Sequence, residues 1–168
     1  MMTHPMRLPI PLLAAALLAG TVPATAGTAT TTFAVNATVV ATCSVSAGPL
    51  NFGAAIPSPV NDNIDATGTI TATCSASVPY NIALSAGQGA AATMAVRKLT
   101  SGTNAMDYTL YTDAARSSVW GDGSAGSVVN NLTGTGVAQA ITVFGRIPAG
   151  QAPMAGIYSD RITVTVNF

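Results

Sequence analysis

The run TGTITATCSASVPYNIALSAG, residues 67–87, contains two stretches of alternating apolar and polar residues separated by a short turn. Alternation with period two, rich in β-branched residues, is typical of β-strands that bury one face. The first stretch places Ile70, Ala72 and Cys74 on one face and Thr69, Thr71 and Thr73 on the other, and the second places Val78, Tyr80, Ile82 and Leu84 inward. The run therefore predicts two consecutive half-buried strands.

The same alternation recurs along the chain. In AMDYTLYTD (residues 105–113) it aligns Met106, Tyr108 and Leu110, and in QAITVFGRI (residues 139–147) it aligns Ile141, Val143 and Ile147. Clusters of Gly, Pro, Asn, Asp and Ser separate these runs and predict turns. Many short strands at such spacing predict an all-β antiparallel sandwich or barrel. Residues 48–65 are too rich in Pro and Gly for a central strand, so we expect an edge strand and a surface loop there.

The first 26 residues match a secretory signal peptide. Arg7 precedes an apolar stretch over residues 10–19, and small residues occupy the expected cleavage site at 24–26. A membrane anchor is the alternative, but the apolar stretch is shorter than the roughly 20 residues that a spanning helix needs. We also find no later segment long and apolar enough to cross a membrane. We predict a signal peptide over residues 1–26 and an exported mature chain.

The mature chain has the length of one domain and contains two cysteines, Cys43 and Cys74. In an exported protein an isolated pair predicts a disulfide, the alternative being two buried free thiols. Closing a loop of about 30 residues stabilises a fold by about 3 to 4 kcal/mol through loop-closure entropy. The whole sequence has a formal net charge of zero. Without a basic surplus, nucleic acid is not an expected partner.

Catalytic and metal-binding patterns are missing from the mature sequence. It contains no Glu, and the single His, His4, leaves with the signal peptide. Ser-His-Asp and Cys-His arrangements and histidine metal sites are thereby excluded. Asp62 and Asp65 in NDNID could hold Ca²⁺, but the loop lacks a bidentate acid at its end and is better interpreted as a turn. We expect no enzyme activity, no catalytic residue, no metal and no cofactor.

Apolar-faced strands are predicted at both ends of the mature chain. Near its start Phe33, Val35, Ala37 and Val39 share one face, and residues 27–46 carry no charge. A mobile tail is normally polar and charged. In the final stretch, which we expect to be a strand over residues 162–168, the inward face comprises Ile162, Val164, Val166 and Phe168. Such an edge persists only when something covers it, so the two strands pair either with each other or with other molecules.

Five motifs in order resemble the spore coat protein U domain, the domain of subunits of archaic (Csu-type) chaperone–usher pili. They are LNFG (50–53), residues 67–87 quoted above, MDYTLYTDAARSSVWGDG (106–123), VFGRIPAGQ (143–151) and AGIYSDRITVTVNF (155–168). The resemblance extends from about Phe33 to Phe168. It implies an incomplete immunoglobulin-like antiparallel β-sandwich over residues 41–168, completed by a donor strand. The donor would be the N-terminal extension, residues 27–40, of another subunit.

The resemblance also implies partners and roles. Identical or related subunits would join head to tail, after a periplasmic chaperone has held each one and an outer-membrane usher has received it. Phe33, Val35, Ala37 and Val39 would be the inserted side chains. The final strand, with Ile162, Val164, Val166 and Phe168, would line the receiving groove and contact the chaperone. The disulfide would then hold the base of the extension to the domain.

Two functions follow from this resemblance. The chain is either a structural subunit of a surface pilus for adhesion and biofilm formation, or a self-complemented coat or surface protein of the same fold. A tip adhesin, which would carry a second domain, is less compatible with the length of the chain. Asp160 falls on the inward side of the expected strand, where it either caps a turn near Tyr158 or is recognised by the assembly machinery.

Overall fold

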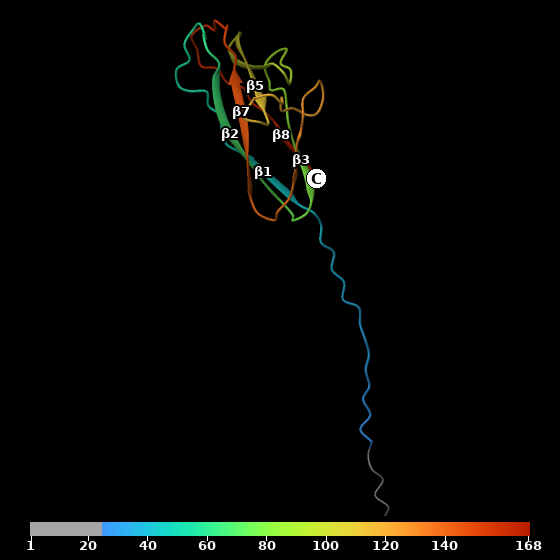
Figure 1. The fold of residues 1–168 in the computed structure, drawn as a ribbon. Helices are drawn as coiled ribbons and strands as arrows, with labels where there is room; N and C mark the ends of the chain where they lie inside the picture. Colours follow the sequence, from blue (N-terminus) through green and yellow to red (C-terminus); the bar gives the residue numbers. More distant parts are fainter. Residues whose placement is uncertain (1–24) are drawn as a thin grey trace, which may run out of the picture. The chain divides into compact units, whose positions relative to one another are not determined.

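The computed structural model describes residues 25–168, so most of the predicted signal peptide lies outside the described residues. Residues 25–42 are exposed and belong to no strand. Residues 38–168 form one compact unit, separate from the segment that ends at Ala37. This unit is an antiparallel β-sandwich, and no helix occurs among residues 25–168 (Figure 1).

Eight strands form two sheets. The strands are β1 (Cys43–Ala47), β2 (Ile64–Cys74), β3 (Pro79–Leu84), β4 (Arg97–Ser101), β5 (Asn104–Tyr111), β6 (Asn130–Thr133), β7 (Gln139–Ile147) and β8 (Val164–Asn167). The larger sheet has the order β1-β2-β7-β5-β4, and the smaller one has the order β6-β3-β8. All ladders between these strands are antiparallel.

The core lies between the two sheets and consists of the inward residues of the alternating runs. Its members from the strands are Ile70, Ala72, Cys74, Tyr80, Ile82, Leu84, Met106, Tyr108, Leu110, Ile141, Val143 and Ile147. Trp120, from the loop after β5, is completely buried and donates its indole N–H to the carbonyl of Ile82 over 2.8 Å. The predicted inward faces of β2, β3, β5 and β7 are thus confirmed. Period-two geometry explains them, because it places alternate side chains of a strand on one face.

The loop between β1 and β2 packs its apolar side chains on the inner face of the larger sheet. Leu50 and Phe52 lie over Gly68 of β2 and Gly145 of β7. A Cβ at Gly68 would lie 3.1 Å from Leu50, and one at Gly145 would lie 2.9 Å from Phe52. The two glycines therefore provide the space in which this loop approaches the sheet, since any larger residue would displace it.

The predicted fold class, an all-β antiparallel sandwich of immunoglobulin-like type, is confirmed, while its completion by a donor strand stays a prediction. Two expectations about strand limits were wrong. The predicted edge strand within residues 48–65 is a loop up to the start of β2, with one isolated bridge at Val60. The last strand begins at Val164 rather than Ile162, because the backbone of residues 160–163 is crossing between the sheets and has no regular ladder there.

Residues 25–168 include no helix of the length and hydropathy that spanning a membrane requires.

Candidate functional site

Each sheet has two edge strands, and one edge strand of the larger sheet lies close to one of the smaller sheet. β1 pairs with β2 at the edge of the larger sheet, and β8 pairs with β3 at the edge of the smaller one. β1 and β8 approach each other without forming a ladder. Val45 and Ala47 share the inner face of the sheet with their register partners Ala72 and Ile70, yet both are exposed, Val45 by 38%. The sandwich is therefore open along this side.

A groove of about 330 Å³ enters the core at this opening. We call it the open groove. Its floor consists of core side chains, namely Ile70, Leu84, Tyr108, Leu110 and Val143. Its rim consists of Ala47, Leu50, Phe52, Asp160, Arg161, Ile162 and Val164. The lining is mostly apolar, with Thr69 as a polar member and both charges at the end formed by Asp160 and Arg161, so the open groove suits a row of small and medium apolar side chains.

Of the four residues predicted on the final strand, Ile162 and Val164 line the open groove. Val166 is half-buried against the core but lies outside the lining, and Phe168 follows β8 with 61% of its surface exposed. The alternation itself is confirmed over residues 161–167, where the even-numbered side chains are half-buried and the odd-numbered ones exposed.

Sequence reasoning did not identify the floor or the Leu50–Phe52 rim as parts of this groove. The floor residues are recognisable in the sequence as inward-facing, but their grouping at one opening depends on the strand order. LNFG gave a local signal, since two apolar residues flank Asn51 and precede a glycine. That pattern does not reveal which surface the loop covers.

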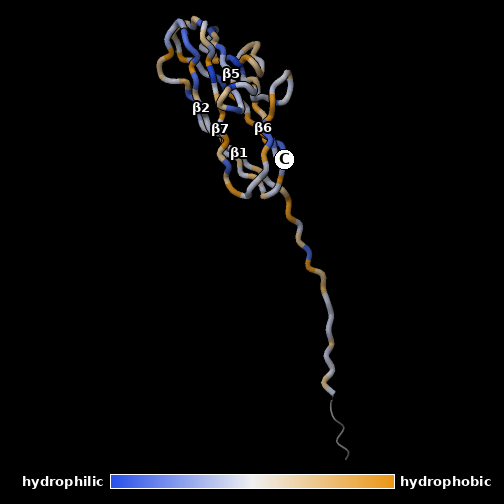
Figure 2. Tube along the Cα trace, in the orientation of Figure 1, coloured by the Kyte–Doolittle hydropathy of each residue, from blue (hydrophilic) through white to orange (hydrophobic). Residues whose placement is uncertain are grey.

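The predicted donor residues lie in the exposed segment before β1. Phe33 is 85% exposed, Val35 81% and Val39 93%, and Ala37 is exposed as well. Figure 2 shows that apolar residues recur along this segment. No contact of these side chains tests their assignment as donor residues, which stays a prediction. An uncharged stretch with this much exposed apolar surface is unusual for a chain surrounded by water.

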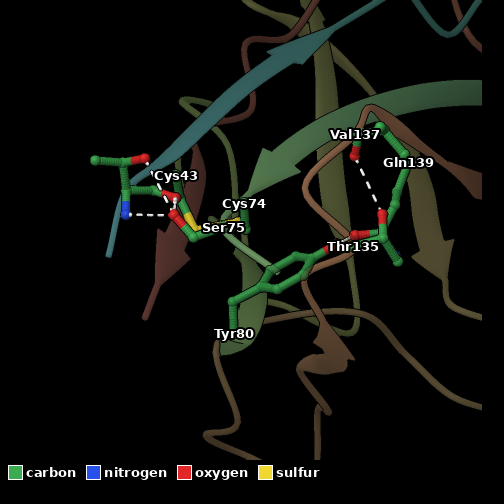
Figure 3. The surroundings of a disulfide bond; sticks show 8 residues. Cys43, Cys74, Ser75, Tyr80, Thr135, Val137 and Gln139 are labelled. Carbon is green, nitrogen blue, oxygen red and sulfur yellow. Dashed lines mark hydrogen bonds between the residues drawn. A yellow bond between two sulfur atoms is a disulfide. The ribbon is translucent and has the colours of Figure 1, made fainter. Parts of the chain in front are cut away.

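The disulfide between Cys43 and Cys74 is confirmed (Figure 3). The two cysteines are directly opposite each other in the β1–β2 ladder, at the first residue of β1 and the last of β2. Just outside them, the Ser75 amide donates to the Thr42 carbonyl over 2.9 Å and the Thr42 amide donates to the Ser75 hydroxyl over 3.1 Å. The chain is thus held covalently and by hydrogen bonds where the exposed segment meets β1.

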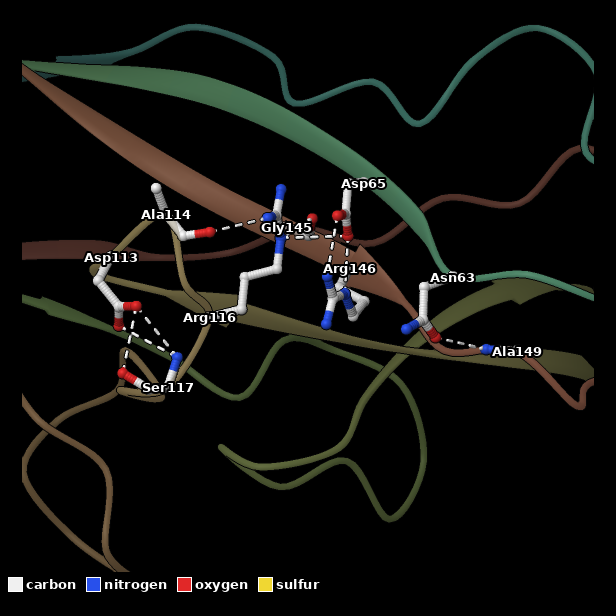
Figure 4. Close-up of polar contacts among 9 residues, drawn as sticks. All are labelled: Asn63, Asp65, Asp113, Ala114, Arg116, Ser117, Gly145, Arg146 and Ala149. Carbon is white, nitrogen blue, oxygen red and sulfur yellow. Dashed lines mark hydrogen bonds and ion pairs between the residues drawn. The ribbon is translucent and has the colours of Figure 1, made fainter.

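Asp65 is engaged by two arginines (Figure 4). Arg146 donates from Nε over 2.7 Å and from a second nitrogen over 2.9 Å, and Arg116 Nε lies 3.1 Å away. The hydrogen bond from Arg146 holds the pKa of Asp65 below its ordinary value, against a smaller effect of burial. The side chain is oriented by these cations, and Asn63 accepts a bond from the Ala149 amide. The turn interpretation of NDNID holds only for residues 61–63, because Asp65 already lies in β2 and its carboxylate is engaged by the two arginines.

Asp160 lies at one end of the open groove and accepts three hydrogen bonds. The donors are the Tyr108 hydroxyl over 2.7 Å, the Gln88 amide over 2.8 Å and the Arg161 amide over 2.7 Å. Burial raises the pKa of Tyr108, and the hydrogen bond to Asp160 raises it further. Asp160 therefore connects β5 with the loop after β3. The expected role in capping a turn near Tyr158 was wrong.

Comparisons with known proteins agree on one family. The profile of the spore coat protein U domain matches residues 29–165. Protein U of Myxococcus xanthus is 31% identical over 169 residues, which cover 92% of this chain and 93% of that protein.

A solved structure shares the fold. It is the CsuC–CsuE chaperone–tip adhesion subunit pre-assembly complex from the archaic chaperone-usher Csu pili of Acinetobacter baumannii, with a TM-score of 0.54 at 23% identity. The match covers 78% of this chain and 40% of the chain in that structure, so this protein spans about two fifths of its length. With a profile match across most of its residues and a relative of almost equal extent, the chain belongs to the spore coat protein U domain family.

Proposed function

We propose that this protein is a structural subunit of a chaperone–usher pilus. In this proposal it polymerises by donor-strand exchange into a surface fibre for adhesion and biofilm formation. The observation that carries the proposal is the open groove: core side chains are reachable between two unpaired strand edges, β1 and β8. An added strand would satisfy the backbone groups of such an edge and place alternate side chains on the exposed floor.

The exposed N-terminal segment has the properties that this groove requires. In extended conformation residues 33–39 span about 23 Å, comparable with the C-terminal edge formed by residues 160–167, of which Asp160 to Val164 border the groove. Burying one Phe and two Val contributes about 1.5 to 3 kcal/mol each. The donor domain of this scheme is residues 27–40 and the receiving domain is residues 41–168. In the receiving domain, the final strand would contact the chaperone through Ile162, Val164, Val166 and Phe168.

A donor in its own domain's groove would yield a closed monomer, whereas a donor in a neighbour's groove yields an open, head-to-tail chain. Contacts of the second kind do not close on themselves and produce filaments. Before assembly a periplasmic chaperone would cover the groove, and an outer-membrane usher would exchange it for the next subunit. The solved pre-assembly complex of a chaperone with a subunit of the same fold supports the chaperone step of this scheme. The predicted signal peptide would export the chain to the periplasm, and assembly into the pilus would bring it to the cell surface.

Two variants test the proposal. Deleting residues 27–39 should leave a domain that is degraded or insoluble in the periplasm unless its chaperone is co-expressed. Moving the same residues behind Phe168 through a short linker should give a stable monomer, because the donor then reaches the groove of its own chain. Full-length protein should give ladders in unheated gels that collapse on boiling, since no covalent bond joins the subunits.

The second candidate is a self-complemented coat or surface protein, which the family's description and Protein U of Myxococcus xanthus support. A full-length protein that stays monomeric would favour this candidate. A deletion variant that is soluble, monomeric and stable without a chaperone would contradict the need for any donor strand and overturn the pilus proposal.

A further inference from the structure

The C-terminal segment changes from one sheet to the other just before β8. Ser159 exchanges two backbone hydrogen bonds with Thr100 of β4, of 2.9 and 3.0 Å, in the larger sheet. Five residues later Val164 is the register partner of Leu84 of β3, in the smaller sheet. Residues 160–163 therefore cross the space between the sheets, and the position of the whole groove-lining strand depends on where this crossing occurs.

Asp160 is the first residue of the crossing, and its carboxylate holds the crossing to both layers. Oδ2 accepts from Tyr108 of β5, and Oδ1 accepts from the Gln88 amide in the loop after β3. Gly87 has a φ of +92°, and a Cβ there would collide with the carboxylate of Asp160. A glycine is therefore required at position 87 for two reasons: it adopts the positive φ readily, and its lack of a side chain leaves room for the Asp160 carboxylate.

The residues after Asp160 become part of the groove and continue into the β3 ladder. Ile162 and Val164 line the open groove together with Asp160 and Tyr108. Between them, the Ser85 amide donates to the Thr163 carbonyl over 3.0 Å and the Thr163 amide donates to the Ser85 hydroxyl over 2.9 Å. A displaced crossing would move both apolar side chains relative to the groove floor.

We propose that Asp160 is the positioning residue of the open groove, holding the sheet-to-sheet crossing so that Ile162 and Val164 are set for an incoming strand. The inference rests on the proposed function. A donor strand pairs with the groove edge in a defined register. A shift of that register by one residue would turn the donor side chains away from the groove. Removing the carboxylate leaves three hydrogen-bond donors without this acceptor and detaches the start of the crossing from β5 and from Gln88, while the two Ser85–Thr163 bonds remain.

The test compares four variants of the full-length protein, assembled into fibres. Asp160→Ala removes all three contacts. Asp160→Asn keeps an oxygen for the two amides, and its NH₂ group can donate to the Tyr108 oxygen, so it should rescue. Tyr108→Phe removes one contact only. Asp65→Ala, on the outer surface of the larger sheet, is the matched control because it removes a carboxylate with hydrogen-bonded partners far along the chain.

Two readouts separate positioning from general stability: the rate at which unheated fibres dissociate, and amide hydrogen exchange mapped by mass spectrometry. In Asp160→Ala we expect dissociation about tenfold faster or more, with faster exchange confined to residues 85–88 and 160–166. Tyr108→Phe should lie between wild type and Asp160→Ala, and Asp160→Asn should stay near wild type. Asp65→Ala should leave both readouts of the groove unchanged.

The inference is overturned if Asp160→Ala fibres dissociate no faster than Asp65→Ala fibres, or if exchange rises evenly across the domain. If Asp160→Ala does not accumulate, Tyr108→Phe decides, and wild-type behaviour of that variant overturns the inference. Wild-type protein that forms no ladders overturns the proposed function instead. Ladders of equal stability in all variants overturn only the role of Asp160.

Discussion

Arg97 is buried in the sandwich without a carboxylate in contact. Its guanidinium donates to the backbone carbonyls of Ser85, Met94 and Trp120 over 2.7 to 3.0 Å, and it has no exposed surface. Burial lowers its pKa, while Tyr108, Asp160 and Asp122 act in the opposite direction. This side chain thereby joins the start of β4 to the end of β3 and to the tryptophan loop.

We expect Arg97→Met to lower the free energy of unfolding by about 2 to 4 kcal/mol. Three charge-assisted hydrogen bonds are lost and three carbonyls lose a donor, although the cost of burying the cation is removed as well. Urea unfolding of the permuted monomer measures the change. Lys98→Met, at the next residue of β4, is the control: it removes a cation whose ion pair with Asp107 is partly exposed, and its loss should cost no more than about 1 kcal/mol. Equal losses in both variants would contradict the bridging role.

Asp65 makes the domain sensitive to acid. Because its pKa is lowered in the folded state, chiefly by the hydrogen bond from Arg146, its contribution to stability is present above the ordinary carboxyl value of about 3.9 and is lost as the pH falls through the lowered value. Asp65→Asn should lower the melting temperature at neutral pH and weaken its fall in acid. The effect will be modest because the side chain is 36% exposed.

The measurement is the melting temperature of the permuted monomer from about pH 7 to about pH 2. Asp62→Asn, which makes the same substitution in the exposed turn just before β2, provides the control. A steeper acid transition in Asp65→Asn than in wild type would contradict the sign worked out for this group.

At the scale of elements, β1 is the least protected strand of the larger sheet, since four of its five residues are exposed. It is held by one ladder and by the Cys43–Cys74 disulfide. Replacing both cysteines with Ala should destabilise the domain by about 3 to 4 kcal/mol. Fibres of this variant should also dissociate faster under load, because the donor segment then leaves from a frayed strand.

Thermal unfolding and fibre stretching check the two effects of the cysteine replacement. The variant with Ser44→Ala and Thr73→Ala, at the neighbouring register pair, is the control for changes in β1 and β2 that leave the disulfide intact. Unchanged assembly and fibre strength without the disulfide would remove its proposed role in transmitting load.

The two faces of β8 offer a matched pair of substitutions. Val164 is half-buried and lines the open groove, whereas Thr165 points outward and is exposed. Val164→Asp should abolish donor-strand exchange, because an inserted strand would bury an unpaired carboxylate. Thr165→Asp, with the same charge on the same strand, should still assemble. Ladder formation in unheated gels separates the two, and loss of ladders in both would point to a folding defect rather than a groove.

At the scale of the whole molecule, we expect the stability of the fibre to depend little on salt concentration, because the surfaces that would pair carry few charges. Residues 27–46 carry no charge, and the open groove carries charge only at the end formed by Asp160 and Arg161. Screening weakens interactions between exposed charges but not the burial of apolar surface. Fibres should therefore keep their ladders from about 0.1 to about 1 M sodium chloride. A loss of ladders in high salt would indicate that ion pairs hold the subunits together.

The prediction that residues 27–40 act as a donor strand concerns more than one molecule, because no contact within a single copy tests it. Phe33, Val35, Ala37 and Val39 are exposed in the single chain, as both a donor for another molecule and an unused tail would be. Only the partner molecule distinguishes the two, which is why the decisive experiment moves the segment rather than substituting it.

The sequence alone determines the strands and their inner faces, because period-two alternation is a local property of extended backbone. It predicted the inward residues of β2, β3, β5 and β7, and it predicted the disulfide from an isolated cysteine pair. It misplaced the start of β8, because Ile162 keeps the alternation although its backbone has not yet joined the ladder with β3. It also assigned an edge strand to the loop that carries Leu50 and Phe52.

The tertiary structure decides which of these faces remains uncovered. The order β1-β2-β7-β5-β4 and the position of β8 bring Ala47, Tyr108 and Val164 to one opening, although they are far apart in the chain. The contacts that shape the opening also join distant positions, with a sequence separation of 72 for Asp160 and Gln88 and of 52 for Asp160 and Tyr108. Local patterns carry no information about such pairs, because their closeness results from how the sheets stack and where the chain crosses between them.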